Sequence, residues 1–179
     1  AAPIVEALAG GADIVITGRV ADPSLAVAAC VHRFGWNDTE LHRLAGATVA
    51  GHLIECGAQV PGGTFTDWRE VDGWATIGAP IAECHADGSC VITKHPGTGG
   101  MVTLGTVTAQ LLYEVGGAEY LNPDVTARFD TLRLTQVGPD RVLIDSTHGA
   151  LPPERLKVAM NYLGGFRNTL TLVQTGLGA

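Results

Sequence analysis

The sequence has few charged residues, few aromatic residues and no long hydrophobic run. Charged residues occupy 16% of the 179 positions and aromatic residues 6%. A surface this poor in charge is typical of a chain that is partly covered by other protein. Because no apolar run approaches the roughly 20 residues that cross a bilayer, no membrane-spanning helix and no membrane partner are expected.

Basic residues and cysteine motifs are also scarce. Lys and Arg number 11 against 18 Asp and Glu, a net charge of −7, so a nucleic-acid partner is not expected. The N-terminal residues lack the basic and apolar regions of a signal sequence. The cysteines are widely spaced without a C-x-x-C pair, which favours reduced thiols and a cytoplasmic protein: Cys30, Cys56, Cys84 and Cys90.

Glycine, by contrast, is abundant. The chain has 24 glycines, and 46% of its residues are hydrophobic. That content is enough for a core, and the glycines favour tight connections over a helical bundle. The pattern predicts one α/β domain over residues 1–179, or an α+β domain. We expect a mixed β-sheet flanked by helices, with glycine-rich loops between strands and helices.

The residue pattern predicts the individual elements. Helices are expected over 3–9, 24–34, 39–56 and 103–115. Small residues in the third helix, among them Gly46 and Gly51, predict that another backbone packs closely against it. Strands are expected over 12–17, 80–85, 90–94, 125–136, 141–146 and 155–162, with 169–175 as a further candidate.

The loop KHPGTGG at 94–100 is the first candidate site. Its amide groups and the following helix could hold an anion, with Lys94 as a point charge. The candidate ligand-binding residues are Lys94, Gly97, Thr98, Gly99 and Gly100. Neither the P-loop nor the G-x-G-x-x-G pattern is met, so no nucleotide cofactor is indicated. A plain turn remains the alternative.

The segment TGRVADPS at 17–24 is the second candidate. Arg19 could hold a carboxylate or phosphate through two parallel hydrogen bonds. Asp22 is the expected N-cap of the helix that follows Pro23 and is also a candidate ligand-binding residue. In the alternative interpretation, Arg19 pairs with Asp22 or with backbone carbonyls.

The segment AGHLIECG at 50–57 is the third candidate. His52 and Glu55 are three residues apart, so they share a helix face and could form an oriented acid/base couple. They are the candidate catalytic residues. Alternatively, His52 is a hydrogen-bonded core histidine. No H-E-x-x-H repeat occurs, so the spacing predicts no metal site.

The turn Asp87-Gly88 predicts a hairpin and a register. With these two residues at the centre of the turn, Cys84 would face Val91. Cys84 and Cys90 would then point to opposite sides of the sheet and could share neither a zinc ion nor a disulfide. A bulge would reverse this conclusion.

The chain resembles the acyclic terpene utilisation (AtuA-like) family in five segments: ADIVITGRVADPSLA (12–26), GWNDTELHRLAGATVAGHLIECGAQVPGG (35–63), ADGSCVITKHPGTGGMVTLGTVTAQLLYEV (86–115), YLNPDVTARFD (120–130) and GPDRV (138–142). The resemblance implies bacterial catabolism of acyclic isoprenoids such as citronellol and geraniol, beside CoA-linked enzymes. It also implies that the chain is a central fragment of a larger domain. Residues 94–96 depart from the double proline expected after the lysine.

Two functions from different classes follow. In the first, the protein is an enzyme acting on an acyl-CoA or related carboxylic intermediate. Arg19, Lys94 and the 97–100 backbone would hold the anionic part, and His52 with Glu55 would transfer protons. In the second, it is a non-catalytic binding or assembly subunit of a carboxylase or hydratase system. Low charge and the small-residue helix predict contact with a second copy or with further parts of the protein.

Overall fold

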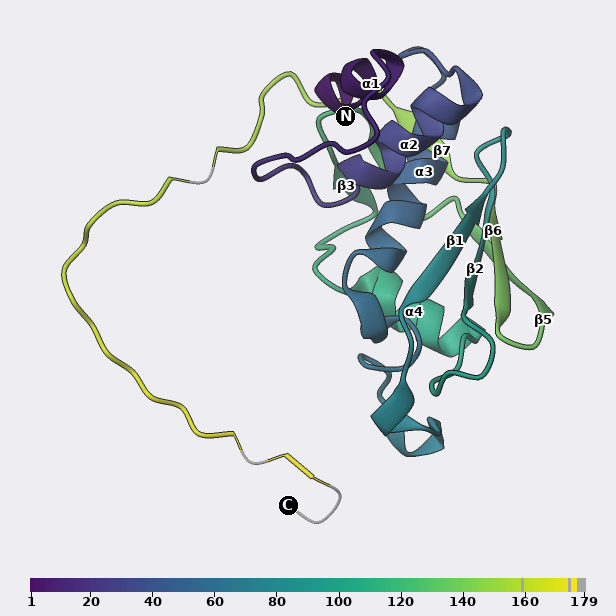
Figure 1. The fold of residues 1–179 in the computed structure, drawn as a ribbon, viewed down its shortest axis with the longest axis vertical. Coiled ribbons are helices and arrows are strands. Elements are labelled where there is room, and N and C mark those ends of the chain that lie inside the picture. Colours follow the sequence, from purple (N-terminus) through teal and green to yellow (C-terminus); the bar gives the residue numbers. More distant parts are fainter. Residues whose placement is uncertain (159, 174, 177–179) are drawn as a thin grey trace.

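The computed structural model describes residues 1–158, 160–173 and 175–176 (Figure 1). Its four described α-helices are α1 (Ala2–Ala9), α2 (Ser24–Phe34), α3 (Leu41–Ile54) and α4 (Leu104–Leu112). Short 3-10 helices cover Gly57–Gln59, Trp68–Glu70 and Trp74–Thr76. The strands are β1 (Pro80–Cys84), β2 (Cys90–Lys94), β3 (Glu119–Leu121), β4 (Thr126–Arg128), β5 (Arg133–Gly138), β6 (Arg141–Asp145) and β7 (His148–Ala150).

The strands form two antiparallel sheets. One has the order β1-β2-β6-β5 and the other the order β3-β4-β7. Helix α3 packs against strands of both sheets as well as against α2 and α4. The predicted class is therefore confirmed in its α+β form, with helices flanking the sheets.

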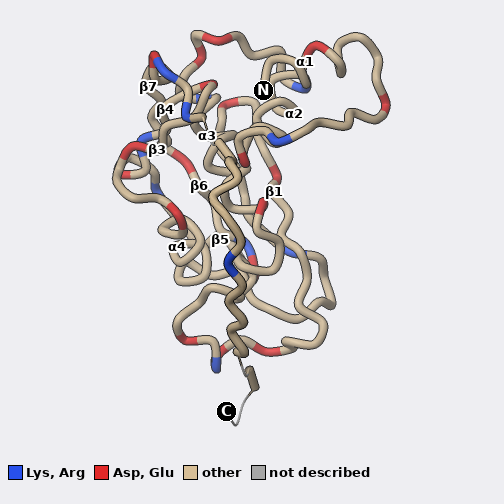
Figure 2. Tube along the Cα trace, turned by 90° about the vertical axis from the view of Figure 1, so that its left-hand side faces the viewer, with Lys and Arg blue, Asp and Glu red and all other residues tan. Residues whose placement is uncertain are grey.

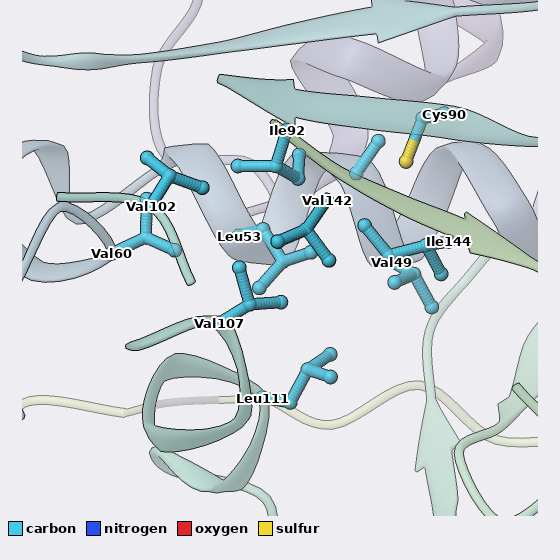
Figure 3. Close-up of a cluster of buried hydrophobic side chains, with 11 residues drawn as sticks. Val49, Leu53, Val60, Cys90, Ile92, Val102, Val107, Leu111, Val142 and Ile144 are labelled. Carbon is cyan, nitrogen blue, oxygen red and sulfur yellow. The ribbon is translucent and has the colours of Figure 1, made fainter. Parts of the chain in front are cut away.

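Helix α3 is the centre of the structure. All its residues from Leu44 to Leu53 are buried, as expected of a helix that is covered on every side. One core cluster lies between α3, α4 and the four-stranded sheet, where Leu53, Ile92 and Val142 meet (Figure 3). A second cluster packs α2 and α3 against β4, through Val27 and Ala127 among others.

Two glycines let other segments touch α3, as the sequence predicted. A Cβ atom on Gly46 would lie 1.9 Å from the carbonyl oxygen of Gly88 at the hairpin tip. A Cβ atom on Gly51 would lie 2.7 Å from Cα of Pro23, directly before α2. Real Cβ atoms do not approach backbone so closely, so each contact requires glycine.

The predicted strand over residues 12–17 is wrong. These residues have no strand structure, and the side chains of Ile14 and Ile16 are 82% and 92% exposed. The sequence pattern is that of a buried strand, but none of the described strands pairs with it. A β-branched run forms a strand only when a partner supplies the other half of its hydrogen bonds.

The two strands predicted near the C-terminus are also absent from the described residues. Residues 155–158 and 160–162 have no strand structure, and neither do 169–173 and 175, while 159 and 174 lie outside the described residues. This part of the chain extends away from the two core clusters (Figure 1). The sequence did not predict the strands β3 and β7, because three residues are too few to show the alternation of a strand.

The hairpin β1–β2 is confirmed, but its predicted register is wrong. Cys84 pairs with Cys90, so both side chains lie on the same face of the sheet. The cause is Gly88, whose φ of +92° adds a bulge residue to the turn. The N–H of His85 therefore donates to the carbonyl of Ser89. All four cysteines are free thiols.

None of the described helices is long and apolar enough to cross a bilayer.

Candidate functional site

His52 is held in one orientation by a reciprocal contact between α3 and α4. Its side chain is 1% exposed. The ring Nε2–H donates to the backbone carbonyl of Gln110 at 2.9 Å, and the Gln110 side-chain amide donates to the carbonyl of His52 at 3.2 Å. Because Nε2 carries the hydrogen, the neutral ring has an open lone pair on Nδ1.

Nδ1 of His52 faces the carboxylate of Glu55, one turn further along α3. The distance from Nδ1 to Oε1 is 3.3 Å. Nδ1 and both Glu55 oxygens are buried and have no hydrogen-bond donor. Two acceptors this close repel each other unless a proton or a cation lies between them.

Burial shifts both groups toward their neutral forms. Desolvation, followed by the nearby charges of Asp22 and Glu114, raises the pKa of Glu55 to about 7. Desolvation lowers the pKa of His52.

Asp22 and Glu114 complete an acidic cluster around Glu55. One carboxylate oxygen from each of the three residues lies within 4.8 Å of the others. Asp22 reaches this position because the start of α2 packs against Gly51, four residues before Glu55 on α3. The cluster combines the turn before α2, the end of α3 and the loop after α4.

The predicted capping role of Asp22 is wrong. The N-cap of α2 is Pro23, and no side chain caps this helix end. The Asp22 carboxylate lies beside Glu55 and Glu114 instead. Asp22 is therefore placed for interaction with the acidic cluster, not for stabilising its own helix.

Glu114 is the cluster residue that the sequence did not reveal. It follows the end of α4 and has a φ of +61°, a conformation that costs energy for any residue with a Cβ. Its partners lie on two distant segments of the sequence, so no local spacing indicates it. Only the contact between α3 and α4 brings it to Glu55.

Aromatic rings form the apolar side of the site. The rings of Tyr120 and Phe129 lie 5.3 and 5.7 Å from the His52 ring, measured between centroids. Burial raises the pKa of Tyr120 to about 12, so its hydroxyl stays protonated at neutral pH. These rings exclude water from one side of His52, which strengthens the electrostatic contacts on the other.

The glycine-rich loop is engaged in contacts within the protein. Lys94 Nζ donates to the carbonyl of Thr98 at 2.8 Å and lies 3.4 Å from the Asp140 carboxylate. Its ammonium group thus joins the loop to the turn between β5 and β6. The charge is already balanced by Asp140.

The loop amides are engaged as well. The N–H groups of Thr98, Gly99 and Gly100 donate to the carbonyls of His95, Thr76 and Asp72. The N-terminus of α4 is closed separately by a capping box between Thr103 and Thr106. Gly97 has a φ of +78°. This geometry favours the plain-turn alternative, and anion binding by Lys94 and Gly97–Gly100 stays a prediction.

Arg19 lies on the exposed segment between α1 and α2. Among the described residues, no salt bridge joins it to Asp22. Of the predicted residues, the structure brings together His52, Glu55 and Asp22. The loop 97–100 belongs to a separate set of contacts, with the 72–76 segment.

A family model described as acyclic terpene utilisation family protein AtuA matches residues 1–179. The chain belongs to the AtuA family. The resemblance predicted from the sequence motifs is thus confirmed, and the family links the protein to the utilisation of acyclic terpenes. Searches of curated proteins and of solved structures gave no match.

The AtuA chain also has an apolar groove that the His52 cluster does not line. Its volume is about 930 Å³, and α1 and α2 form much of its wall. Val27, Val31 and Leu44 contribute apolar surface. Charged residues are sparse along the AtuA chain as a whole (Figure 2).

Proposed function

We propose that this AtuA chain is an enzyme of acyclic terpene catabolism that acts on an acyl-CoA or related carboxylic intermediate at His52 and Glu55. The observation that carries the proposal is the open lone pair of a buried Nδ1, 3.3 Å from Glu55 Oε1. A structural histidine normally satisfies both ring nitrogens. This one keeps one nitrogen without a donor, beside a carboxyl whose pKa is raised to about 7.

The chemistry of the intermediates suits such a pair. A carboxylic acid or thioester carbonyl makes the neighbouring C–H acidic, and an acceptor within hydrogen-bond reach can remove that proton. His52 and Glu55 are the proposed catalytic residues: Glu55, which is 13% exposed, takes the proton from the substrate, and the buried His52 receives it through Nδ1. Asp22 lies beside them. Arg19, whose side chain is exposed, is proposed to hold the distant anionic group, with the 94–100 loop as a further contact.

An assembly role is the second candidate function. It is favoured by large apolar side chains that the described structure leaves exposed. In the N-terminal half the most exposed are Ile14 and Ile16, at 82% and 92%. The C-terminal segment adds Leu156, Val158, Met160, Tyr162, Leu163, Phe166, Leu170, Leu172 and Val173. A second copy of the chain or a carboxylase or hydratase subunit would cover them.

The location of the protein is part of the same proposal. Acyl-CoA chemistry and four free thiols are typical of the cytoplasm, so we propose a cytoplasmic protein.

Ligand-dependent stabilisation tests the proposed enzyme. The melting temperature is measured with branched acyl-CoAs, free terpenoid acids and nucleotides, because a ligand that binds the native state must stabilise it. Acyl-CoAs or terpenoid acids should raise the melting temperature, and nucleotides should not. Incubation in D₂O should then introduce deuterium next to the carbonyl of the bound compound, detected by NMR.

Two variants test whether deuterium incorporation depends on Glu55. Glu55→Gln should abolish deuterium incorporation, while Glu70→Gln on an exposed 3-10 helix should leave it unchanged. Binding without incorporation would favour the assembly role. Absence of stabilisation by every carboxylic compound would overturn both the ligand class and the enzyme proposal.

A further inference from the structure

We infer that Asp22, Glu55 and Glu114, together with Nδ1 of His52, bind one divalent ion of the first transition row, such as Mn²⁺ or Zn²⁺. The inference goes beyond the proposed function, since it depends on these side chains alone and not on a substrate. A bound ion would occupy the Nδ1 lone pair, and Glu55 alone would then accept the proton. The sequence predicted no metal site because the four ligands come from three separate segments. The fold brings the three carboxylates within 4.8 Å of one another and places Nδ1 of His52 3.3 Å from Glu55 Oε1.

The charge of the cluster is the first argument. Three carboxylates converge within 4.8 Å, and the described ion pairs include no lysine or arginine that neutralises any of them. Both Glu55 oxygens are buried without a donor. A shared proton can satisfy one contact between Glu55 and His52, but it leaves the repulsion between the carboxylates in place. A dication would balance the charge of the carboxylates and coordinate the imidazole nitrogen at the same time.

The buried imidazole is the second and independent argument. His52 is 1% exposed, and its unpartnered Nδ1 points at Glu55 Oε1. Its other nitrogen donates to the Gln110 carbonyl. Metal-binding histidines characteristically use the second nitrogen in this way, since a hydrogen bond to a carbonyl fixes the tautomer and aims the free lone pair.

The spacing fits a small cation. With metal–oxygen distances of about 2.2 Å, ligands on opposite sides of an ion are about 4.4 Å apart, and adjacent ligands about 3.1 Å apart. The three carboxylate oxygens lie within 4.8 Å of one another, and Nδ1 adjoins them through Glu55 Oε1 at 3.3 Å. Binding requires Asp22 and Glu114, both of which are exposed, to move inward toward Nδ1 of His52.

The donor set selects the ion. Three carboxylates and one imidazole suit Mn²⁺, Fe²⁺ or Zn²⁺, whereas Mg²⁺ and Ca²⁺ favour all-oxygen sites with more ligands or bound water. Four protein ligands also leave a coordination position on the exposed side. An anionic substrate could bind there despite the three carboxylates, and the ion would polarise its carbonyl oxygen.

Direct titration of the chelator-treated protein tests the inference. Isothermal titration with Mn²⁺ and with Zn²⁺ should show one site per chain, and saturating metal should raise the melting temperature. Mg²⁺ and Ca²⁺ should bind at least tenfold more weakly. Asp22→Asn and Glu114→Gln should each weaken Mn²⁺ binding at least tenfold, and the matched control Glu70→Gln should not change it.

A spectroscopic signature identifies the imidazole. Pulsed electron paramagnetic resonance of bound Mn²⁺ should show coupling to one ¹⁴N nucleus, which His52→Gln should remove. Since His52 is buried, a second variant tests the site without disturbing the core. Glu114→Gly relieves the positive φ, so the metal-free protein should stay folded while its Mn²⁺ affinity falls at least tenfold.

Saturable binding that survives Asp22→Asn and Glu114→Gln would overturn the inference, and so would a lack of binding or of nitrogen coupling. None of these measurements contains an acyl-CoA, so they succeed or fail independently of the proposed substrate class.

Discussion

Gly51 of α3 and Pro23, the residue before α2, are in direct backbone contact. A Cβ atom on Gly51 would lie 2.7 Å from Cα of Pro23. This contact sets the distance between the two helices and, with it, the position of Asp22 beside Glu55. A glycine without chemical function of its own therefore determines whether the acidic cluster forms.

The first prediction is that Gly51→Ala disrupts the cluster. The added methyl group must push α2 away, at a cost of about 1–3 kcal/mol, which the higher helix propensity of alanine offsets in part. Urea denaturation should show a net loss of stability, and Mn²⁺ affinity should fall with it.

Gly46→Ala is the matched control for this prediction. It forces an even closer clash on the same helix, but against Gly88 of the hairpin. It should lower stability and leave Mn²⁺ affinity unchanged. Equal effects of the two variants on affinity would show that Gly51 does not position Asp22.

The second prediction concerns the repulsion within the cluster. In metal-free protein, Asp22→Asn and Glu114→Gln should each raise the free energy of unfolding by about 0.5–1 kcal/mol, because each removes one like charge from an exposed group. The gain should shrink at high salt and disappear when metal is present. Urea denaturation with chelator and with Mn²⁺ separates the two states, and a loss of stability in chelator would contradict the prediction.

The third prediction is a pH dependence at the four-stranded sheet. Arg141 donates to Glu83 at 2.9 Å, and this hydrogen bond lowers the pKa of the carboxyl below 4.5. The contact therefore stabilises the folded state above pH 4.5, and this contribution is lost as the pH falls through the lowered pKa. Both side chains are about two-fifths exposed, so the effect is small and sensitive to salt.

Comparison of wild type with Glu83→Gln measures this contribution. The difference in their unfolding free energies should be larger at about pH 6 than at about pH 3. A difference that stays constant over this range would show that the ion pair is absent in solution.

The fourth prediction follows from the burial of two thiols. Cys30 and Cys90 are 6% and 1% exposed, and burial raises the pKa of the Cys90 thiol far above its usual range. Neither should react with iodoacetamide in the native protein, whereas all four cysteines should react in urea. Peptide mapping by mass spectrometry identifies the labelled residues, and rapid native labelling of Cys90 would contradict the packing of β2.

Local signals predicted much of the fold. Helix α2 ends where Gly35 takes a φ of +67°, as its position after the helix predicted. The turn at Asp87-Gly88 predicted the hairpin. Its register depended on whether Gly88 would be a central turn residue or a bulge, and the local sequence allows both.

The candidate site was predictable only where its residues share an element. The three-residue spacing of His52 and Glu55 placed them on one helix face, and the structure has them 3.3 Å apart. Asp22 was recognised, but with the wrong partner, because a cap is the usual role of an aspartate before a helix. Glu114 joins them through tertiary packing, so the spacing of residues along the sequence does not indicate it.

The reciprocal bonds between His52 and Gln110 couple the two helices mechanically. Gln110 lies four residues before Glu114, so a shift of α4 would tilt the imidazole and withdraw a carboxylate in a single movement. His52 and Glu114, two of the four proposed ligands, would then be gained or lost together. Occupancy of the site and the docking of α4 onto α3 would accordingly behave as one cooperative equilibrium, in which each event reports on the other.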